Sequence, residues 1–194
     1  MNCYCWLPHS TISGGWASYE NGTVSFTTTN HEATDEGVDS SDDAVTAIRP
    51  PTSSTGPGKV VLGLSPNGDN TLEAVDFLPA GWTQITGVTA RIRAKVVPHG
   101  ETTPTDQVVE VKVGDDGDSE QAGDCTFTIS GTTYQTYEED VTGGKTLPAN
   151  VNGYPGDTTA IDWEDFVSRW EMSEYRKNET SLEISAIEVC VEGS

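Results

Sequence analysis

Apolar and polar residues alternate along much of this chain, which predicts β-strands. The clearest case is residues 85–97, ITGVTARIRAKVV. Alternation of this kind places successive side chains on opposite faces and is typical of an antiparallel strand with one buried face. One face carries Val88, Ala90, Ile92, Ala94 and Val96, and the other carries Thr89, Arg91, Arg93 and Lys95.

Shorter segments repeat the pattern, with turn residues between them. In the last of them the parity of the apolar positions changes between Ile184 and Ile187, which predicts a β-bulge or kink near Ala186. Many short strands separated by turns favour an all-β protein built as an antiparallel sandwich or barrel. The segments are 23–28, 59–65, 108–113, 125–129, 132–140 and 181–192.

Residues 162–170, DWEDFVSRW, follow a different period. Trp163, Phe166, Val167 and Trp170 fall at i, i+3, i+4 and i+7, which is one stripe of an α-helix. Asp162 is placed to cap the amino end of that helix. We therefore expect one short helix near the C-terminus, lying on the sandwich as a lid over one open end.

Residues 1–16 mix aromatic, cysteine, proline and glycine residues and do not show a clean strand pattern. We expect them to form an N-terminal arm, with residues 17–194 as a single domain. Exposed aromatic side chains favour association, so the arm is expected to dock, either on its own domain or, as we favour, on a neighbouring subunit. The predicted contact residues are Tyr4, Trp6 and Leu7.

The charge balance limits the partners. The chain of 194 residues has 31 acidic and 10 basic residues, with a formal net charge of −21. Nucleic acids and anionic membrane surfaces attract clustered Lys and Arg, so neither is expected as a partner. The chain shows no apolar run long enough to span a membrane and no signal-peptide pattern at its start, so we expect it to fold inside a cell.

The four cysteines are Cys3, Cys5, Cys125 and Cys190. The Cys3 and Cys5 spacing does not suit a zinc site, which normally uses two separated pairs. Cys125 and Cys190 lie in strand-like segments, where a thiol usually packs as a small apolar side chain. A disulfide between Cys125 and Cys190 is the less favoured alternative.

No catalytic motif appears, so we expect a protein that is not an enzyme, with no catalytic residues, no cofactor-binding residues and no metal ligands. The acidic turn around Asp115, Asp116 and Asp118 offers oxygen ligands of the kind that Ca²⁺ prefers. It does not match the twelve-residue calcium loop, and a solvated acidic hairpin is the favoured interpretation.

Several short motifs occur in an order that resembles the jelly-roll domains of tailed-bacteriophage virion proteins. The resemblance spans about residues 20–193 and implies an antiparallel jelly-roll β-sandwich. The motifs are Ile85, Gly87 and Val88; Tyr134, Thr136 and Tyr137; Trp163, Asp165 and Phe166; and Ile187, Val189 and Val191.

The resemblance implies a non-enzymatic virion structural protein, assembled in the host cytoplasm. A capsid decoration protein is expected, bound to the major capsid protein or to copies of itself, with a trimer favoured by analogy. A tail or fibre component is one alternative. A carbohydrate-binding module is the other, with Tyr154 and Trp82 as the candidate glycan contacts, because sandwiches of this shape also serve that role.

Overall fold

The chain is an all-β antiparallel sandwich in the computed structural model. The model describes residues 2–14, 16–20, 23–24, 32–39, 46–50, 58–66, 78–79, 81–98, 105–114, 123–143, 147–148, 166–172 and 180–194. Every strand pairing within this part of the chain is antiparallel. The described residues include no helix that is long and apolar enough to cross a membrane.

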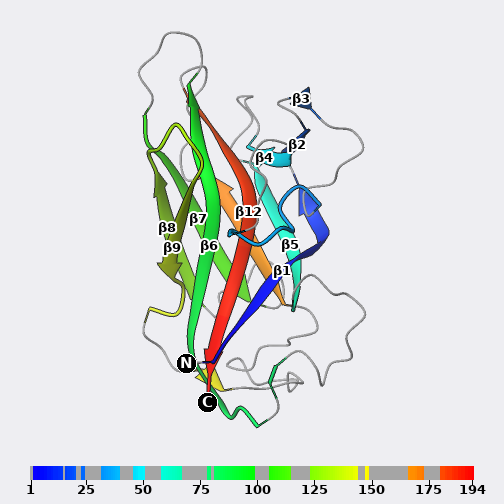
Figure 1. Cartoon of the computed structure of the whole chain (residues 1–194), viewed down its shortest axis with the longest axis vertical. Helices are drawn as coiled ribbons and strands as arrows, with labels where there is room; N and C mark the ends of the chain where they lie inside the picture. The colour runs from blue at the N-terminus through cyan, green and yellow to red at the C-terminus, as the bar shows by residue number, and fades with distance from the viewer. Residues whose placement is uncertain are drawn as a thin grey trace.

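The strands form two layers with the core between them (Figure 1). One layer is centred on the two long strands β6 (Gln84–Pro98) and β12 (Thr180–Gly193), with β9 (Gln135–Asp140) on the outer edge of β6. Beyond β12 this layer continues through β4 (Thr46–Arg49), β2 (Ala17–Glu20) and β3 (Thr23–Val24), and β10 (Leu147–Pro148) pairs with the start of β6.

The second layer runs in the order β5, β11, β7, β8. These strands span Lys59–Pro66, Val167–Met172, Gln107–Gly114 and Gly123–Ile129. The inward residues of both layers meet in one apolar cluster, which includes the ring of Phe127 stacked on that of Trp170 at 5.9 Å between centroids. Burial of these large aromatic side chains contributes strongly to stability, because it removes a large apolar area from water.

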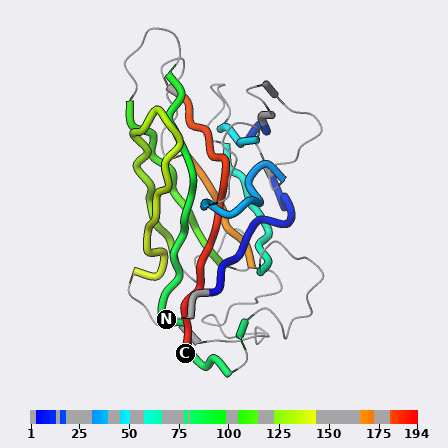
Figure 2. Tube along the Cα trace, viewed as in Figure 1, coloured from blue at the N-terminus to red at the C-terminus, as the bar shows by residue number. Residues whose placement is uncertain are grey.

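Strand β1 (Asn2–Gly14) joins the two layers and corrects the predicted N-terminal arm. Its first half pairs with β12, from Asn2 opposite Gly193 to Trp6 opposite Val189. Its second half pairs with β5, with register shifts on either side of Ser10 and Thr11. Residues 2–14 are therefore a strand of the sandwich, hydrogen-bonded to one layer and then the other, and Asn2 lies beside Gly193, so the two ends of the chain are close together (Figure 2).

The predicted helix is wrong where the structure describes it. Val167–Met172 is strand β11, held between β5 and β7. Trp170 faces the core with no exposed surface, and its Nε1 donates a hydrogen bond of 2.9 Å to the buried hydroxyl of Ser168. Residues 162–165, including Trp163, lie outside the described residues.

The strongest sequence predictions are confirmed. Residues 85–97 lie in β6, with Val88, Ala90, Ile92 and Ala94 fully buried. Strand β7 buries Val109, Val111 and Val113 as the alternation required. The pairing of β12 with β6 shifts its register between Ile184 and Ala186, which is the predicted bulge.

Candidate functional site

The outer face of the β9–β6–β12 layer carries a dense set of charged and polar side chains. Backbone register places them in rows that cross the strands. One row runs from Asp140 through Thr89 and Cys190 to Cys5, and the next row joins Glu138, Arg91 and Glu188. The face is rigid because every one of these residues lies on a hydrogen-bonded strand.

Arg91 is the centre of the second row. Its guanidinium contacts Glu188 at 2.7 Å, Glu138 at 3.2 Å and Asp39 at 3.4 Å. Burial alone would lower the pKa of Arg91, but hydrogen bonds and charge attraction from Glu188 and Asp39 outweigh it and raise the pKa. The other carboxylate oxygen of Glu188 accepts the backbone N–H of Val38 at 3.3 Å, which fastens the 32–39 segment over this face.

Glu183 forms a second charged cluster further along β12. Its side chain is only 6% exposed and contacts Arg49 and Lys95, with the Lys95 ammonium 2.9 Å from one oxygen. The Tyr134 hydroxyl donates to the same oxygen at 3.1 Å, and the Lys95 ammonium lies 4.2 Å from the centre of the Tyr134 ring. Burial raises the pKa of Glu183, but the hydrogen bonds from Lys95 and Arg49 more than offset it, so the pKa lies below its ordinary value.

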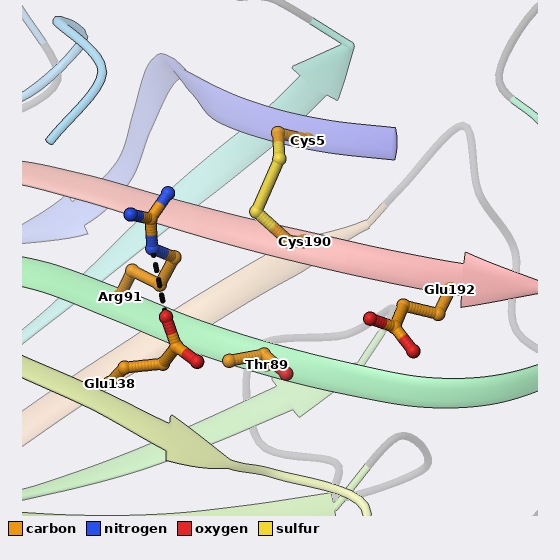
Figure 3. A pocket seen from close by; sticks show the side chains of 6 residues that line it. All are labelled: Cys5, Thr89, Arg91, Glu138, Cys190 and Glu192. Atoms are coloured by element: carbon orange, nitrogen blue, oxygen red, sulfur yellow. Dashed lines mark ion pairs between the residues drawn. A yellow bond between two sulfur atoms is a disulfide. The ribbon is translucent and has the colours of Figure 1, made fainter. Parts of the chain in front are cut away.

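A hollow of about 200 Å³ opens on this face at the end where the first and last strands pair. Its floor is Thr89 together with the sulfur atoms of Cys5 and Cys190 (Figure 3). Arg91 and its ion-pair partner Glu138 stand on one side, and Glu192 stands on the other. The hollow therefore combines a small apolar surface with hydroxyl, guanidinium and carboxylate groups.

The sulfur atoms belong to a disulfide between Cys5 and Cys190, which face each other on β1 and β12 with Cα atoms 4.1 Å apart. The expectation that Cys190 packs as a thiol is therefore wrong, and so is the less favoured Cys125–Cys190 disulfide. Cys125 is a free thiol on β8, half-buried against the core. Burial, followed by the nearby carboxylates of Glu139, Asp124 and Asp140, raises the pKa of Cys125 to about 12.

The residues that the sequence proposed as binding contacts lie elsewhere. Trp6 has no exposed surface and packs edge-on against Phe166 in the core, while Tyr4 and Leu7 are half-buried on β1. They belong to the sandwich itself, so the structure does not present them as an extended contact arm.

Trp82 is half-buried and its ring packs on Gly193, leaving no room there for a Cβ atom. The next residues, Thr83 and Gln84, donate backbone hydrogen bonds of 2.8 and 3.1 Å to the Ser194 carbonyl. Trp82 therefore holds the end of β12 in place. Tyr154 and the acidic turn with Asp115, Asp116 and Asp118 lie outside the described residues.

Sequence reasoning missed the residues that form the hollow. The outward position of Arg91 was visible in the alternation of 85–97, and so was that of Thr89. Their partners were not visible, because Glu138 and Glu188 become neighbours of Arg91 only through the register of three strands. The pairing of Cys5 with Cys190 likewise depends on β1, which was not expected to be a strand.

No protein-family model matches this sequence, and no curated protein matches it significantly. Solved structures with a remotely similar arrangement include an arabinose-bound α-L-arabinofuranosidase, with 10% identity, a TM-score of 0.44, and coverage of 96% of this chain but 23% of that one. A CBM4 structure has 17% identity, a TM-score of 0.41 and coverage of 93% and 95%.

A family 11 carbohydrate-binding module from Clostridium thermocellum, in complex with a β-1,3-1,4-mixed-linked tetrasaccharide, has 14% identity and a TM-score of 0.38, with coverage of 98% and 97%. This chain thus spans about a quarter of the arabinofuranosidase and nearly the whole of the two modules. These similarities are too remote to carry an argument about function.

Proposed function

We propose that this protein is a non-catalytic carbohydrate-binding domain and that the hollow on the outer face of β6 and β12 is its glycan site. The observation that carries the proposal is the lining of the hollow. Thr89, Arg91, Glu138 and Glu192 surround a disulfide on a rigid sheet. Binding sites of this kind combine an apolar surface with a few fixed polar groups that set orientation.

The chemistry of the lining suits the hydroxyl groups of a neutral sugar. Carboxylates accept hydrogen bonds, a guanidinium donates several, and a threonine hydroxyl does both. The disulfide offers an apolar surface to the C–H face of a sugar ring. At about 200 Å³ the hollow is smaller than the 300–1,000 Å³ typical of drug-sized ligands, so it suits a terminal or single sugar unit of a chain.

Charge favours a neutral glycan over an acidic one. Arg91 is already paired with Glu138 and Glu188, so it has little positive charge to offer a ligand. Glu192 adds a further negative charge to the lining, and the chain as a whole carries −21. A uronate carboxylate would meet this field and be repelled.

The same pairing supports binding without catalysis. Hydrolysis of a glycosidic bond normally uses two carboxyl groups, one of which donates a proton to the leaving oxygen. Glu138, which lines the hollow, and Glu188, which lies beside it, both form ion pairs with Arg91. Carboxylate oxygens positioned in this way can accept hydrogen bonds from the hydroxyl groups of a ligand.

A glycan array of neutral hexose and pentose oligosaccharides, with a matched set containing uronates, tests the proposal. We expect binding to members of the neutral set and none to the uronates. Calorimetry on the best neutral ligand should then give an affinity about 5-fold weaker for Thr89→Val, the loss of one hydrogen bond worth about 1 kcal/mol. Thr128→Val is the matched control, because Thr128 is exposed on β8 in the opposite layer. An array without hits, or equal effects of the two substitutions, would overturn the proposal.

A virion structural protein is a second candidate, supported by the sequence resemblance alone. Three of its four motifs lie on strands, with Ile85, Gly87 and Val88 on β6, Tyr137 on β9 and Val189 on β12, whereas the motif of Trp163, Asp165 and Phe166, expected to begin a helix, is followed by strand β11. In this proposal the protein contacts the major capsid protein or copies of itself, or belongs to a tail or fibre. Mass spectrometry of purified particles tests it: hundreds of copies per particle support a capsid decoration role, a few to a few dozen support a tail or fibre, and absence from particles removes the candidate.

A further inference from the structure

We propose that Cys5, Cys190 and Glu188 form a binding site for a thiophilic divalent cation such as Zn²⁺ when the disulfide is reduced. The candidate ligand atoms of these three residues all lie within 4.8 Å of one another. A carboxylate oxygen of Glu188 is 2.9 Å from the Cys190 sulfur. The inference does not depend on glycan binding.

The sheet places the three donors together before any metal arrives. Cys5 and Cys190 are directly opposite on neighbouring strands, with Cα atoms 4.1 Å apart. Glu188 precedes Cys190 by two residues, so its side chain leaves β12 on the same face. Little chain entropy remains to be lost when a metal joins these groups.

The donor set suits zinc. Two thiolates and one carboxylate are ligand types that Zn²⁺ accepts, at about 2.3 Å from sulfur and about 2.1 Å from oxygen. The adjoining hollow gives a water molecule room to complete a tetrahedral site, because both cysteines line it. Arg91 donates to the same Glu188 oxygen at 2.7 Å and the N–H of Val38 to the other at 3.3 Å. Such outer partners orient a carboxylate ligand in metal sites.

The two states exclude each other. A dithiol reductant supplies two electrons and two protons: its sulfurs close into a disulfide while the Cys5–Cys190 bond breaks to give two thiols. Zn²⁺ then forms two Zn–S bonds, and both thiol protons pass to solvent. In the oxidised protein the disulfide joins β1 to β12. In the reduced protein the Zn²⁺ ion, bound to both sulfur atoms, would join the same two strands.

Cobalt titration of the reduced protein tests the site, since Co²⁺ bound to thiolates absorbs strongly in the near ultraviolet. The protein is reduced with dithiothreitol, desalted without oxygen, titrated with Co²⁺ and then displaced with Zn²⁺. We expect one equivalent bound by reduced protein and none by the disulfide form. Cys5→Ser should weaken binding by about 100-fold or more, and Glu188→Gln by about 10-fold.

Two control variants distinguish metal binding at this site from binding to other carboxylates or to the thiol of Cys125. Cys125→Ser removes the cysteine on β8, and Glu110→Gln removes a carboxylate on the outer face of β7, so both should bind like the wild type. If the reduced chain unfolds, circular dichroism gives a second readout, because Zn²⁺ should then restore the β-sheet signal. Reduced protein that neither binds nor refolds with Zn²⁺, or a Cys5→Ser variant that binds as tightly as the wild type, would overturn the proposal.

Discussion

Replacing Cys5 and Cys190 together with alanine measures how much the bond between the terminal strands stabilises the fold. The two residues are 185 positions apart, so the disulfide closes almost the whole chain into a loop. Such a bond stabilises a protein mainly by reducing the number of conformations open to the unfolded chain. Cys190 also packs against its neighbours and is 4% exposed, so its replacement removes some contacts as well.

The expected loss follows from the loop length. For a loop of this size the chain-entropy relation gives about 5 kcal/mol at 25 °C, and measured disulfides typically give about 2–4 kcal/mol. We therefore expect the double variant to lose about 4 kcal/mol. Since natural domains are stable by about 5–15 kcal/mol, this is a large share of the total.

Equilibrium unfolding in urea is the assay, with wild-type, Cys5→Ala/Cys190→Ala and Cys125→Ala proteins compared. The double variant should unfold at a lower urea concentration and with a steeper dependence on urea, because its unfolded chain is less compact. Cys125→Ala should lose only about 1 kcal/mol, the usual cost of one point substitution. A double variant that loses less than about 1 kcal/mol, no more than this control, would show that the bond contributes little to stability.

Three further results are expected. Glu183→Ala should cost about 2 kcal/mol at pH 7, since it leaves Arg49 and Lys95 without their carboxylate. Because the pKa of Glu183 is lowered on folding, its contribution is complete above the unfolded pKa of about 4.3 and is lost as pH falls through the folded value; a gap to wild type that stays constant in acid, measured by urea unfolding, would count against this. Since burial raises the pKa of Cys125 to about 12, iodoacetamide at pH 8 should label it about 100-fold more slowly than an ordinary thiol, and rapid labelling seen by mass spectrometry would contradict its described surroundings. Trp170→Ala should lower the free energy of unfolding by about 4 kcal/mol, because the fully buried ring leaves a cavity between the layers; a thermal unfolding midpoint close to that of wild type would be inconsistent with this packing.

Strands whose two faces differ sharply could be predicted from the sequence. Residues 85–97 and 108–113 expose polar side chains on one face and bury β-branched or small apolar ones on the other, so their period is unambiguous. The bulge near Ala186 could be predicted for the same reason, because a parity change in an otherwise regular strand needs one extra residue.

Strand β11 was mistaken for a helix because two positions break its alternation. Ser168 is polar but buried, since its hydroxyl accepts the hydrogen bond from Trp170. Val167 is apolar and lies on the outer side of the strand, although it is also buried there, with only 7% of its surface exposed. Because a polar residue lies on the buried side and an apolar residue on the outer side, the apolar positions no longer alternate. They match the stripe of a helix instead.

Strand β1 could not be predicted from the sequence because register shifts and a proline interrupt its pattern. The hollow could not be predicted either, because Cys5 of β1 lines it. The pairing of β1 shifts on both sides of Ser10 and Thr11, which breaks the period that a strand would show. The disulfide and the neighbours of Arg91 depend on which residues face each other across strands. A pattern along one strand carries no information about the register between strands.

An NMR titration of isotope-labelled protein with the neutral oligosaccharide that binds best on the array would locate the glycan site directly. If the hollow is the glycan site, saturable shifts of the backbone amide signals should cluster at Thr89, Arg91, Glu138, Cys190 and Glu192. The outer face of β7 and β8 should be unaffected. Shifts confined to that opposite face, or no saturable shift at any residue, would contradict the proposed function.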